Sequence, residues 1–270
     1  MTINLTEEIN SIYAMLNADE YPEVHARLKF FMEHGEEDMT ANDLAAALRE
    51  ADKPLDLPGF IIDFIIELYE FGVENDDDQA MNDLGALYYG GSRGCEQSFE
   101  KAVHYYEMAA ERGNRQAQEN LGYCYYYGRV GKPDYEKAYQ YFVMGALTGN
   151  GVSLYKVGDM YLNGYYVKKN ERQAFWIYMT CLQTMTEESE PVISGPVFLR
   201  LGNMFLNGLG TEKDYKNALI SYQKAEAFLY DMVKNGEYMY KKSLNAAISG
   251  QAKARAMLTE ELPDNEWVFD

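Results

Sequence analysis

One internal repeat constrains the fold of this chain more than any other feature. Four glycines stand in matching surroundings, each after an aliphatic residue and three positions before an aromatic one: Gly85, Gly122, Gly158 and Gly202. They lie 37, 36 and 44 residues apart, and another glycine follows each after six positions: Gly91, Gly128, Gly164 and Gly208. Each unit then carries an alanine with an aromatic residue four positions later: Ala102 and Tyr106, Ala138 and Phe142, Ala174 and Tyr178, Ala218 and Tyr222. Self-similarity with a period of about 20 to 50 residues indicates stacked structural repeats.

Each unit predicts a hairpin of two helices. In the first half, the residues before and three after the reference glycine share one helical face. A glycine inside a helix costs about 1 kcal/mol relative to alanine, so we expect the backbone of a neighbouring helix to approach closely there. The glycine six positions on ends the helix, and Asp134 and Asp214 are placed to cap the second helix. Because one hairpin cannot bury its own apolar stripe, neighbouring units must stack.

These motifs resemble the Sel1-like repeat (SLR) family, which is related to tetratricopeptide repeats. The segments AMNDLGALYYGG…EKAVHYYEMAAERGN (80–114) and AQENLGYCYYYG…EKAYQYFVMGALTGN (117–150) carry the alanine, Leu-Gly, tyrosine, glycine and Lys-Ala of its pattern. The resemblance implies an all-α, right-handed superhelix of stacked hairpins that acts as a protein-binding scaffold. We expect four repeats, at about 80–116, 117–152, 153–186 and 197–232, within a repeat region that ends with capping helices at 262.

The segments outside the repeats are expected to frame them. Residues 1–79 show four helical patterns, the last of them LPGFIIDFIIELYEFG, and Thr40 is placed as an N-cap. We expect this region to stack on the first repeat as an amino-terminal cap. The insert TEESEPVISGP (186–196) has the acids and prolines of an exposed loop. Residues 244–258 predict a capping helix, and 263–270 a tail.

Charge restricts the partners that this chain can bind. The net charge is −19, and residues 1–79 hold 20 acidic against 4 basic residues, whereas the remaining residues hold 23 against 20. Nucleic acid and anionic membranes require a basic face, so neither is expected as a partner. A basic protein or peptide is permitted, although solubility alone also accounts for the charge. The amino-terminal segment MTINLTEEINS has neither the basic nor the apolar part of a secretory signal, so a cytoplasmic location is expected.

No familiar catalytic or metal-binding signature is present in the sequence. The three cysteines, Cys95, Cys124 and Cys181, lie far apart and are interpreted as buried or half-buried thiols. The acidic run 74–78 lacks the alternating oxygen ligands and the glycine of an EF-hand loop, and is expected to be the start of a helix. We therefore expect no cofactor, no metal ion and no enzymatic activity.

Tyrosine is unusually frequent in NLGYCYYYGRVGKPDYEKAYQYF (120–142), which holds seven tyrosines. Tyr125 falls on the repeat core, as do Tyr88 and Tyr161. A second stripe lies about a third of a turn away, at positions −3, +1 and +4 from the reference glycine. In tetratricopeptide-like folds the first helices line the concave surface, so the resemblance makes this stripe a candidate groove for a peptide. Its candidate partner-binding residues are Asn82, Tyr89, Glu119, Tyr123, Tyr126, Tyr155, Asp159 and Asn203.

Three classes of function remain open. The first is a non-enzymatic scaffold or adaptor that binds a partner in the groove, and tyrosine suits such a site because it is amphipathic. The second is an immunity or antagonist protein that binds a basic toxin or enzyme through its acidic surface. The third is a hydrolase, since related cysteine-rich repeat proteins have been linked to that activity. Packing against loops or the next unit is the alternative role of the stripe.

Overall fold

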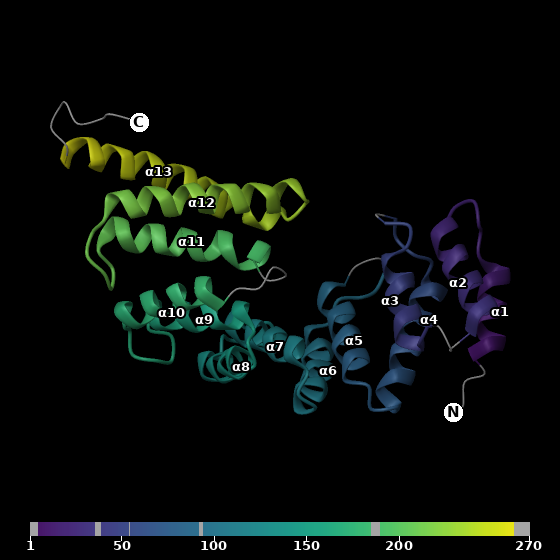
Figure 1. Ribbon diagram of the computed structural model, residues 1–270. Helices are drawn as coiled ribbons and strands as arrows, with labels where there is room; N and C mark the ends of the chain where they lie inside the picture. Colours follow the sequence, from purple (N-terminus) through teal and green to yellow (C-terminus); the bar gives the residue numbers. More distant parts are fainter. Residues whose placement is uncertain (1–4, 36–38, 54, 92–93, 185–189, 262–270) are drawn as a thin grey trace. The chain divides into compact units, whose positions relative to one another are not determined.

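The structure is a computed structural model that describes residues 5–35, 39–53, 55–91, 94–184 and 190–261. Within these ranges every regular element is helical, which confirms the all-α fold class. The α-helices are α1 (Leu5–Met15), α2 (Pro22–His34), α3 (Ala41–Glu50), α4 (Gly59–Glu74), α5 (Asp78–Gly90), α6 (Phe99–Glu111), α7 (Arg115–Tyr127), α8 (Tyr135–Leu147), α9 (Gly151–Asn163), α10 (Glu171–Thr184), α11 (Glu190–Asn207), α12 (Tyr215–Lys234) and α13 (Lys241–Glu261). A 3-10 helix, Tyr238–Tyr240, precedes α13 (Figure 1).

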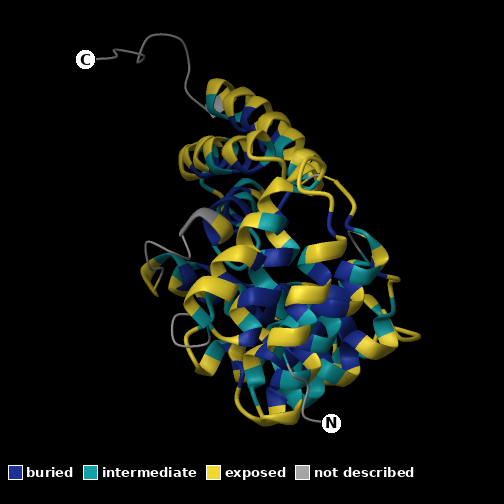
Figure 2. Ribbon diagram, turned by 90° about the vertical axis from the view of Figure 1, so that its right-hand side faces the viewer, coloured by how far each residue is buried: buried dark blue, intermediate teal, exposed yellow. Residues whose placement is uncertain are grey.

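The chain divides into two compact units, which are described separately. Unit 1 is Met1–Asp134 and holds α1 to α7, and unit 2 is Tyr135–Asp270 and holds α8 to α13. In each unit, helices that follow one another in the sequence pack side by side, and in unit 2 α11 also contacts α9 and α13 (Figure 1). Buried residues alternate with exposed ones along the helices, as the dark-blue and yellow bands of Figure 2 show. This arrangement is the stacking of amphipathic hairpins that the repeat predicts.

The reference glycines make room for an aromatic ring. A Cβ atom at Gly158 would lie 2.7 Å from Cε1 of Tyr178, and one at Gly202 would lie 2.8 Å from Cδ1 of Tyr222. Gly85 stands in the same relation to Tyr106, at 2.7 Å. The prediction that a neighbouring helix backbone is the main contact of these glycines is therefore wrong. An aromatic ring from the second helix of the same hairpin fills the space instead. This contact explains why the glycine and the later aromatic residue recur together.

The glycines six positions on end the first helices as predicted. Gly91, Gly128 and Gly164 are C-caps in the left-handed conformation, with φ of 55°, 63° and 74°. Gly208 directly follows α11 with φ of 70°. Positive φ at these four positions suits glycine, because other residues rarely adopt it without strain.

Side-chain caps fix several helix starts. Thr40 and Asp43 form a complete capping box at the start of α3, as the sequence predicts for Thr40. In the acidic run, Asp77 accepts hydrogen bonds from the backbone N–H groups of Gln79 and Ala80, which confirms a helix start at this position. Asp214 caps α12 by accepting from the N–H of Asn217 at 2.8 Å. The matching role of Asp134 stays a prediction.

Helix α4 carries the most apolar face of unit 1 and packs on both α3 and α5. Its buried residues are Ile61, Ile62, Phe64, Ile65, Leu68, Tyr69 and Gly72. Near its end, a Cβ atom at Gly72 would lie 2.5 Å from Cβ of Ala80 in α5. The start of the first repeat is thus built directly against the helix that precedes it.

The prediction of an exposed loop before the fourth repeat is wrong for residues 190–196, which the structure describes. Residues 190–196 form the first part of α11, and Ile193 is fully buried. The apolar residues Ile193, Val197 and Leu201, four positions apart, make one helical stripe, which outweighs the prolines and acids as a signal. Pro191 lies in the first turn, where a missing N–H group costs little. The remainder of the predicted loop, 186–189, and the tail 263–270 lie outside the described residues.

The carboxyl-terminal helices extend the stack beyond the fourth repeat. Helix α13 packs along α12, and its Ala247 and Ala254 are fully buried. A Cβ atom at Gly250 would lie 2.4 Å from two atoms of the Tyr222 ring, which is thus held between Gly202 and Gly250. A helix is present over 244–258 as predicted, and it begins at Lys241; its role as a cap stays a prediction.

Candidate protein-interaction surface

In unit 1 the candidate stripe runs along α5 and α7. Asn82 is buried, whereas Tyr89, Glu119, Tyr123 and Tyr126 are half-buried. The Nδ2 group of Asn120 donates to Oδ1 of Asn82 at 3.1 Å and so joins the two helices. The stripe therefore includes one residue that serves packing and four whose side chains reach solvent in part.

An arginine that the stripe did not include organises its aromatic side chains. The Nε group of Arg129 donates to the hydroxyl of Tyr89 at 3.0 Å. Its guanidinium carbon lies 5.5, 5.2 and 5.5 Å from the ring centres of Tyr89, Phe99 and Tyr127. These distances are those of cation–π contacts. Arg129 is exposed, so a positive charge stands among exposed and half-buried rings on an otherwise acidic chain.

Tyr127 connects this arginine to the stripe. Its ring stacks on Tyr123 at 6.0 Å between centres and meets Tyr126 edge-on at 5.1 Å. Tyr127 is 51% exposed. Together with Tyr89 and Arg129, these tyrosines form one connected group, which we call the tyrosine–arginine cluster.

In unit 2 the corresponding stripe positions hold a buried ion pair. Asp159 receives hydrogen bonds from the Nη2 group of Arg200 at 2.6 Å and from the hydroxyl of Tyr178 at 2.7 Å. The Nε group of Arg200 also donates to Asp159, and Nζ of Lys156 lies 3.7 Å away. The guanidinium carbon is 5.1 Å from the ring centre of Tyr155. The side chains of Asp159 and Arg200 are 7% and 24% exposed.

This ion pair sets the ionisation of Asp159. Burial alone would raise the pKa of its carboxyl group, but the charge and hydrogen bonds of Arg200 outweigh burial and lower the pKa below its usual value. Asp159 is thus an anion whose charge is already matched inside the protein. Tyr155 and Asp159 are both buried, so neither is freely exposed to a partner.

The position after the reference glycine has a shared role in the last two repeats. Asn203, which is exposed, accepts a hydrogen bond from the hydroxyl of Tyr222 at 2.8 Å. Asp159 accepts from Tyr178 in the same way. In both repeats the tyrosine whose ring packs on the glycine also donates a hydrogen bond to the next residue of the first helix, so this stripe position takes part in packing within the hairpin.

The three cysteines are free and buried. Burial raises the pKa of Cys124 and of Cys181 to about 12, so both thiols are protonated and unreactive at neutral pH. Within the described ranges, no group of three His, Cys, Asp or Glu side chains has an arrangement that suits a metal ion. None of the helices described is both long and apolar enough to cross a membrane.

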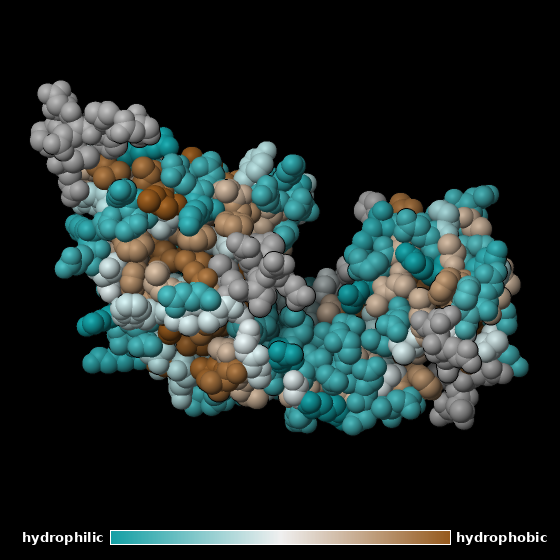
Figure 3. All heavy atoms as spheres, in the orientation of Figure 1, coloured by the Kyte–Doolittle hydropathy of each residue, from teal (hydrophilic) through white to brown (hydrophobic). Residues whose placement is uncertain are grey.

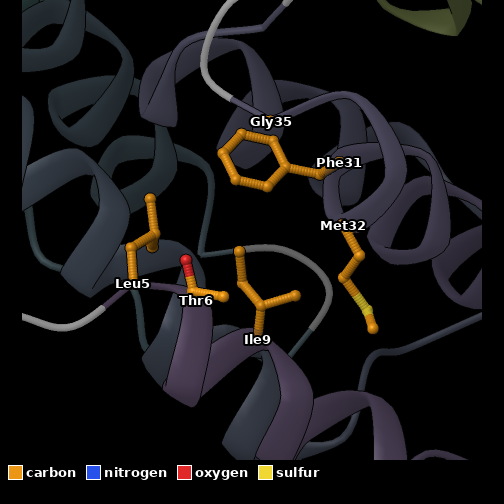
Figure 4. A pocket seen from close by; sticks show the side chains of 6 residues that line it. All are labelled: Leu5, Thr6, Ile9, Phe31, Met32 and Gly35. Atoms are coloured by element: carbon orange, nitrogen blue, oxygen red, sulfur yellow. The ribbon is translucent and has the colours of Figure 1, made fainter.

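Other apolar features lie away from the stripe. A cavity of about 120 Å³ between α1 and α2 is lined by Leu5, Thr6, Ile9, Phe31, Met32 and Gly35 (Figure 4). No charged side chain lines it, so it offers little to distinguish one apolar ligand from another. In unit 2, Trp176, Tyr230 and Met239 are exposed, and Figure 3 shows apolar atoms among hydrophilic ones over α11 to α13.

A family model, the Sel1 repeat, matches residues 78–114, 115–150, 151–178 and 199–227. The chain is a Sel1-like repeat protein. Sel1 repeats generally mediate protein–protein interactions. No curated protein matches this Sel1-like repeat protein at a significant level.

Solved structures share this fold at low sequence identity. A Sel1 repeat protein from Oxalobacter formigenes is 23% identical, with 76% of this chain and 78% of that one covered and a TM-score of 0.56. A protective antigen of uropathogenic Escherichia coli with an SLR fold is 22% identical over 91% of this chain, with a TM-score of 0.60. The match covers 53% of that longer protein. An immunity protein from Pseudomonas aeruginosa is 21% identical over 80% of this chain and 81% of that protein, with a TM-score of 0.45.

The sequence pattern did not indicate two arginines that contact the candidate stripe, Arg129 and Arg200. Arg129 lies in a polar loop, where a charged residue is ordinary. Arg200 is the one basic residue in the apolar segment VISGPVFLRLGNMFL (192–206). Since a lone charge in an apolar helix needs a partner, it could have been paired with Asp159 in the preceding repeat.

Proposed function

We propose that this chain is a non-enzymatic scaffold or adaptor that binds a partner protein or peptide through the first helices of its repeats. The observation that carries the proposal is the tyrosine–arginine cluster of unit 1. Tyrosine and arginine are the residue types most enriched at binding hot spots, together with tryptophan. The rings are held by contacts with Arg129 or with Tyr127 before any partner arrives, which reduces the entropy lost on binding.

The stripe of unit 2 supports this proposal less directly. Asp159 and Tyr155 contribute to the ion pair with Arg200, and Asn203 to the hydrogen bond with Tyr222. We propose that these residues mainly hold the first helices in register. The reducing cytoplasm is the proposed location, because the described cysteines are free thiols.

Replacing Tyr123 and Tyr126 by alanine together is expected to weaken partner binding by tenfold or more, about the effect of losing one hot spot. The partner is first captured with the intact chain from the native cell and identified by mass spectrometry, and its affinity for the variants is then measured. Since the two rings are half-buried, the variant should keep its helical circular dichroism spectrum.

The matched control replaces Tyr230 and Tyr238, which are 57% and 65% exposed in unit 2 and lie outside the stripe. This control should bind as the intact chain does. Equal affinity for both double variants would contradict the proposal, and unfolding of the Tyr123 and Tyr126 variant would place those rings in the core.

A second candidate function is an immunity or antagonist role against a basic toxin or enzyme. The charge asymmetry favours it, since residues 1–79 carry a net charge of −16. Such a surface would steer a basic partner and make its association rate fall steeply with added salt. A captured partner that is basic and salt-sensitive would favour this function over the first.

We also propose that residues 1–79 cap the repeat stack. The contacts of α4 with α5, and the Nη1 group of Arg49 donating to the carbonyl of Asp83 at 3.4 Å, support this role. A chain that begins at Asp78 is expected to melt at a lower temperature than the full chain, because the face of α5 that α4 covers becomes exposed. Differential scanning calorimetry measures the two melting temperatures. An unchanged melting temperature for the chain 78–270 would contradict the proposal that residues 1–79 cap the stack.

A further inference from the structure

A second cavity lies between α1 and α4, on the acidic amino-terminal part of unit 1. Its volume is about 190 Å³, and its apolar lining consists of Ile12 and Met15 from α1 and Phe60 and Phe64 from α4. Ile12 and Phe64 are buried, whereas Met15 is 59% exposed. Methionine is flexible and adapts to apolar side chains of different shape. The cavity, called the α1–α4 groove below, can therefore receive an apolar side chain from outside.

Carboxyl groups border the same groove. Glu8 of α1 and Asp63 and Glu67 of α4 line it. Among the residues that the structure describes, no lysine or arginine pairs with any of the three. This contrasts with Asp159 and Asp76, whose charges are matched by Arg200 and Arg112. The groove thus offers apolar surface and unmatched negative charge side by side.

Two of these carboxyl groups, those of Glu8 and Glu67, lie in contact with each other. The hydrogen bond between Glu67 and Glu8 is the main cause that raises the pKa of Glu67 to about 7, with burial and the charges of Glu8, Asp63 and Glu70 adding to it. A carboxyl group in contact with a second one ionises less readily, because the two negative charges repel each other. A positive charge beside the pair would offset the repulsion between the Glu8 and Glu67 carboxylates.

We propose that the α1–α4 groove binds a basic, amphipathic segment of a partner protein, with an apolar side chain on Phe60 and Phe64 and a lysine or arginine at Glu8 and Glu67. The proposal deepens the second candidate function and rests on it for the basic character of the partner. Charge complementarity selects this occupant, since an acidic or purely apolar segment would leave the carboxyl groups unmatched. In helix-in-groove recognition, an amphipathic helix lays its apolar face into a hydrophobic groove.

Binding of this kind has a defined pH dependence. A lysine or arginine placed at the pair favours the ionised form of Glu67, which then releases its proton. The segment should therefore bind more tightly as the pH rises from about 6 to 8, through the raised pKa of Glu67. The groups that face Glu67 are all acidic, namely Glu8 on α1 and Asp63 and Glu70 on α4, so none of them supplies the opposite trend.

The test uses the full chain and a fluorescein-labelled synthetic peptide of about 14 leucine and lysine residues at helical spacing, followed by fluorescence anisotropy. The double variant Glu8→Gln and Glu67→Gln should bind the peptide about tenfold more weakly than the intact chain and should lose the pH dependence. The control variant, Glu74→Gln and Glu111→Gln, removes the same number of carboxyl groups from two exposed residues that do not line the groove, and should stay within about twofold of the intact chain. A peptide with serine in place of leucine should bind weakly to all of them.

The outcomes separate the two levels of the proposal. Equal weakening in both double variants, or binding that does not change between pH 6 and 8, would overturn the groove while leaving a basic partner in place. No binding of the leucine–lysine peptide to the intact chain at low salt would overturn the groove and the basic partner together. Tenfold selective loss with loss of the pH dependence supports the site.

Discussion

Replacing Asp159 by alanine is expected to lower the free energy of unfolding by about 3 kcal/mol, because it leaves Arg200 in the interior without its carboxylate. The variant also removes the hydrogen-bond acceptor of the Tyr178 hydroxyl. Tyr178 is fully buried, so its hydroxyl would lose this partner in the interior. Because the Arg200 side chain is 24% exposed, water can replace part of the lost interaction, so the lower end of the usual range applies. Urea denaturation followed by circular dichroism measures the change.

The double variant Asp159→Leu with Arg200→Met is the informative control. It removes both charges and fills the site with apolar side chains, so most of the lost stability should return. The contribution of the Asp159 charge is fully present above its ordinary pKa of 3.8 and is lost as the pH falls through the lowered value. A loss below about 1 kcal/mol for the alanine variant would show that the pair behaves as an exposed salt bridge.

The second large effect is expected at a reference glycine. Gly158→Ala should destabilise the chain by about 1 to 3 kcal/mol, because the added methyl group would lie 2.7 Å from the Tyr178 ring. Helix propensity alone predicts the opposite sign, a gain of about 1 kcal/mol. The sign of the change therefore separates the packing role of the glycine from local helix preference.

Gly59→Ala provides the matched comparison. This glycine is the first residue of α4, and no atom lies within 4 Å of the Cβ position. The substitution should leave the stability unchanged or raise it by up to about 1 kcal/mol. Thermal unfolding of the two variants beside the intact chain is sufficient, and stabilisation by Gly158→Ala would contradict the ring contact.

The repeat allowed the fold to be predicted from the sequence, because helical periodicity and helix-ending glycines are local signals. Gly91 or Gly164 can be recognised from its own neighbourhood. The same reliance on local signals explains why the insert before the fourth repeat was wrongly predicted to be a loop. Pro191 and its acidic neighbours, considered alone, are turn signals. The apolar stripe through Ile193 that overrides them becomes visible only over a longer window.

The candidate surface was harder to predict because its residues depend on partners from other helices. Position +1 holds Tyr123 in one repeat and Asp159 in the next, and the pattern alone assigns both to the same face. The burial of Asp159 follows from Arg200, which is 41 residues away in the sequence. Arg129 likewise contacts rings that come from three helices, α5, α6 and α7.

The buried cysteines give the protein internal reporters of its own motions. Cys124 belongs to unit 1 and Cys181 to unit 2, and both are shielded in the folded chain. A thiol reagent can modify each of them only when the surrounding helices open, so the rate of labelling measures the local opening equilibrium. Because each unit holds its own thiol, mass spectrometry of the labelled peptides would give the opening free energy of each unit separately, without a label being engineered into the chain.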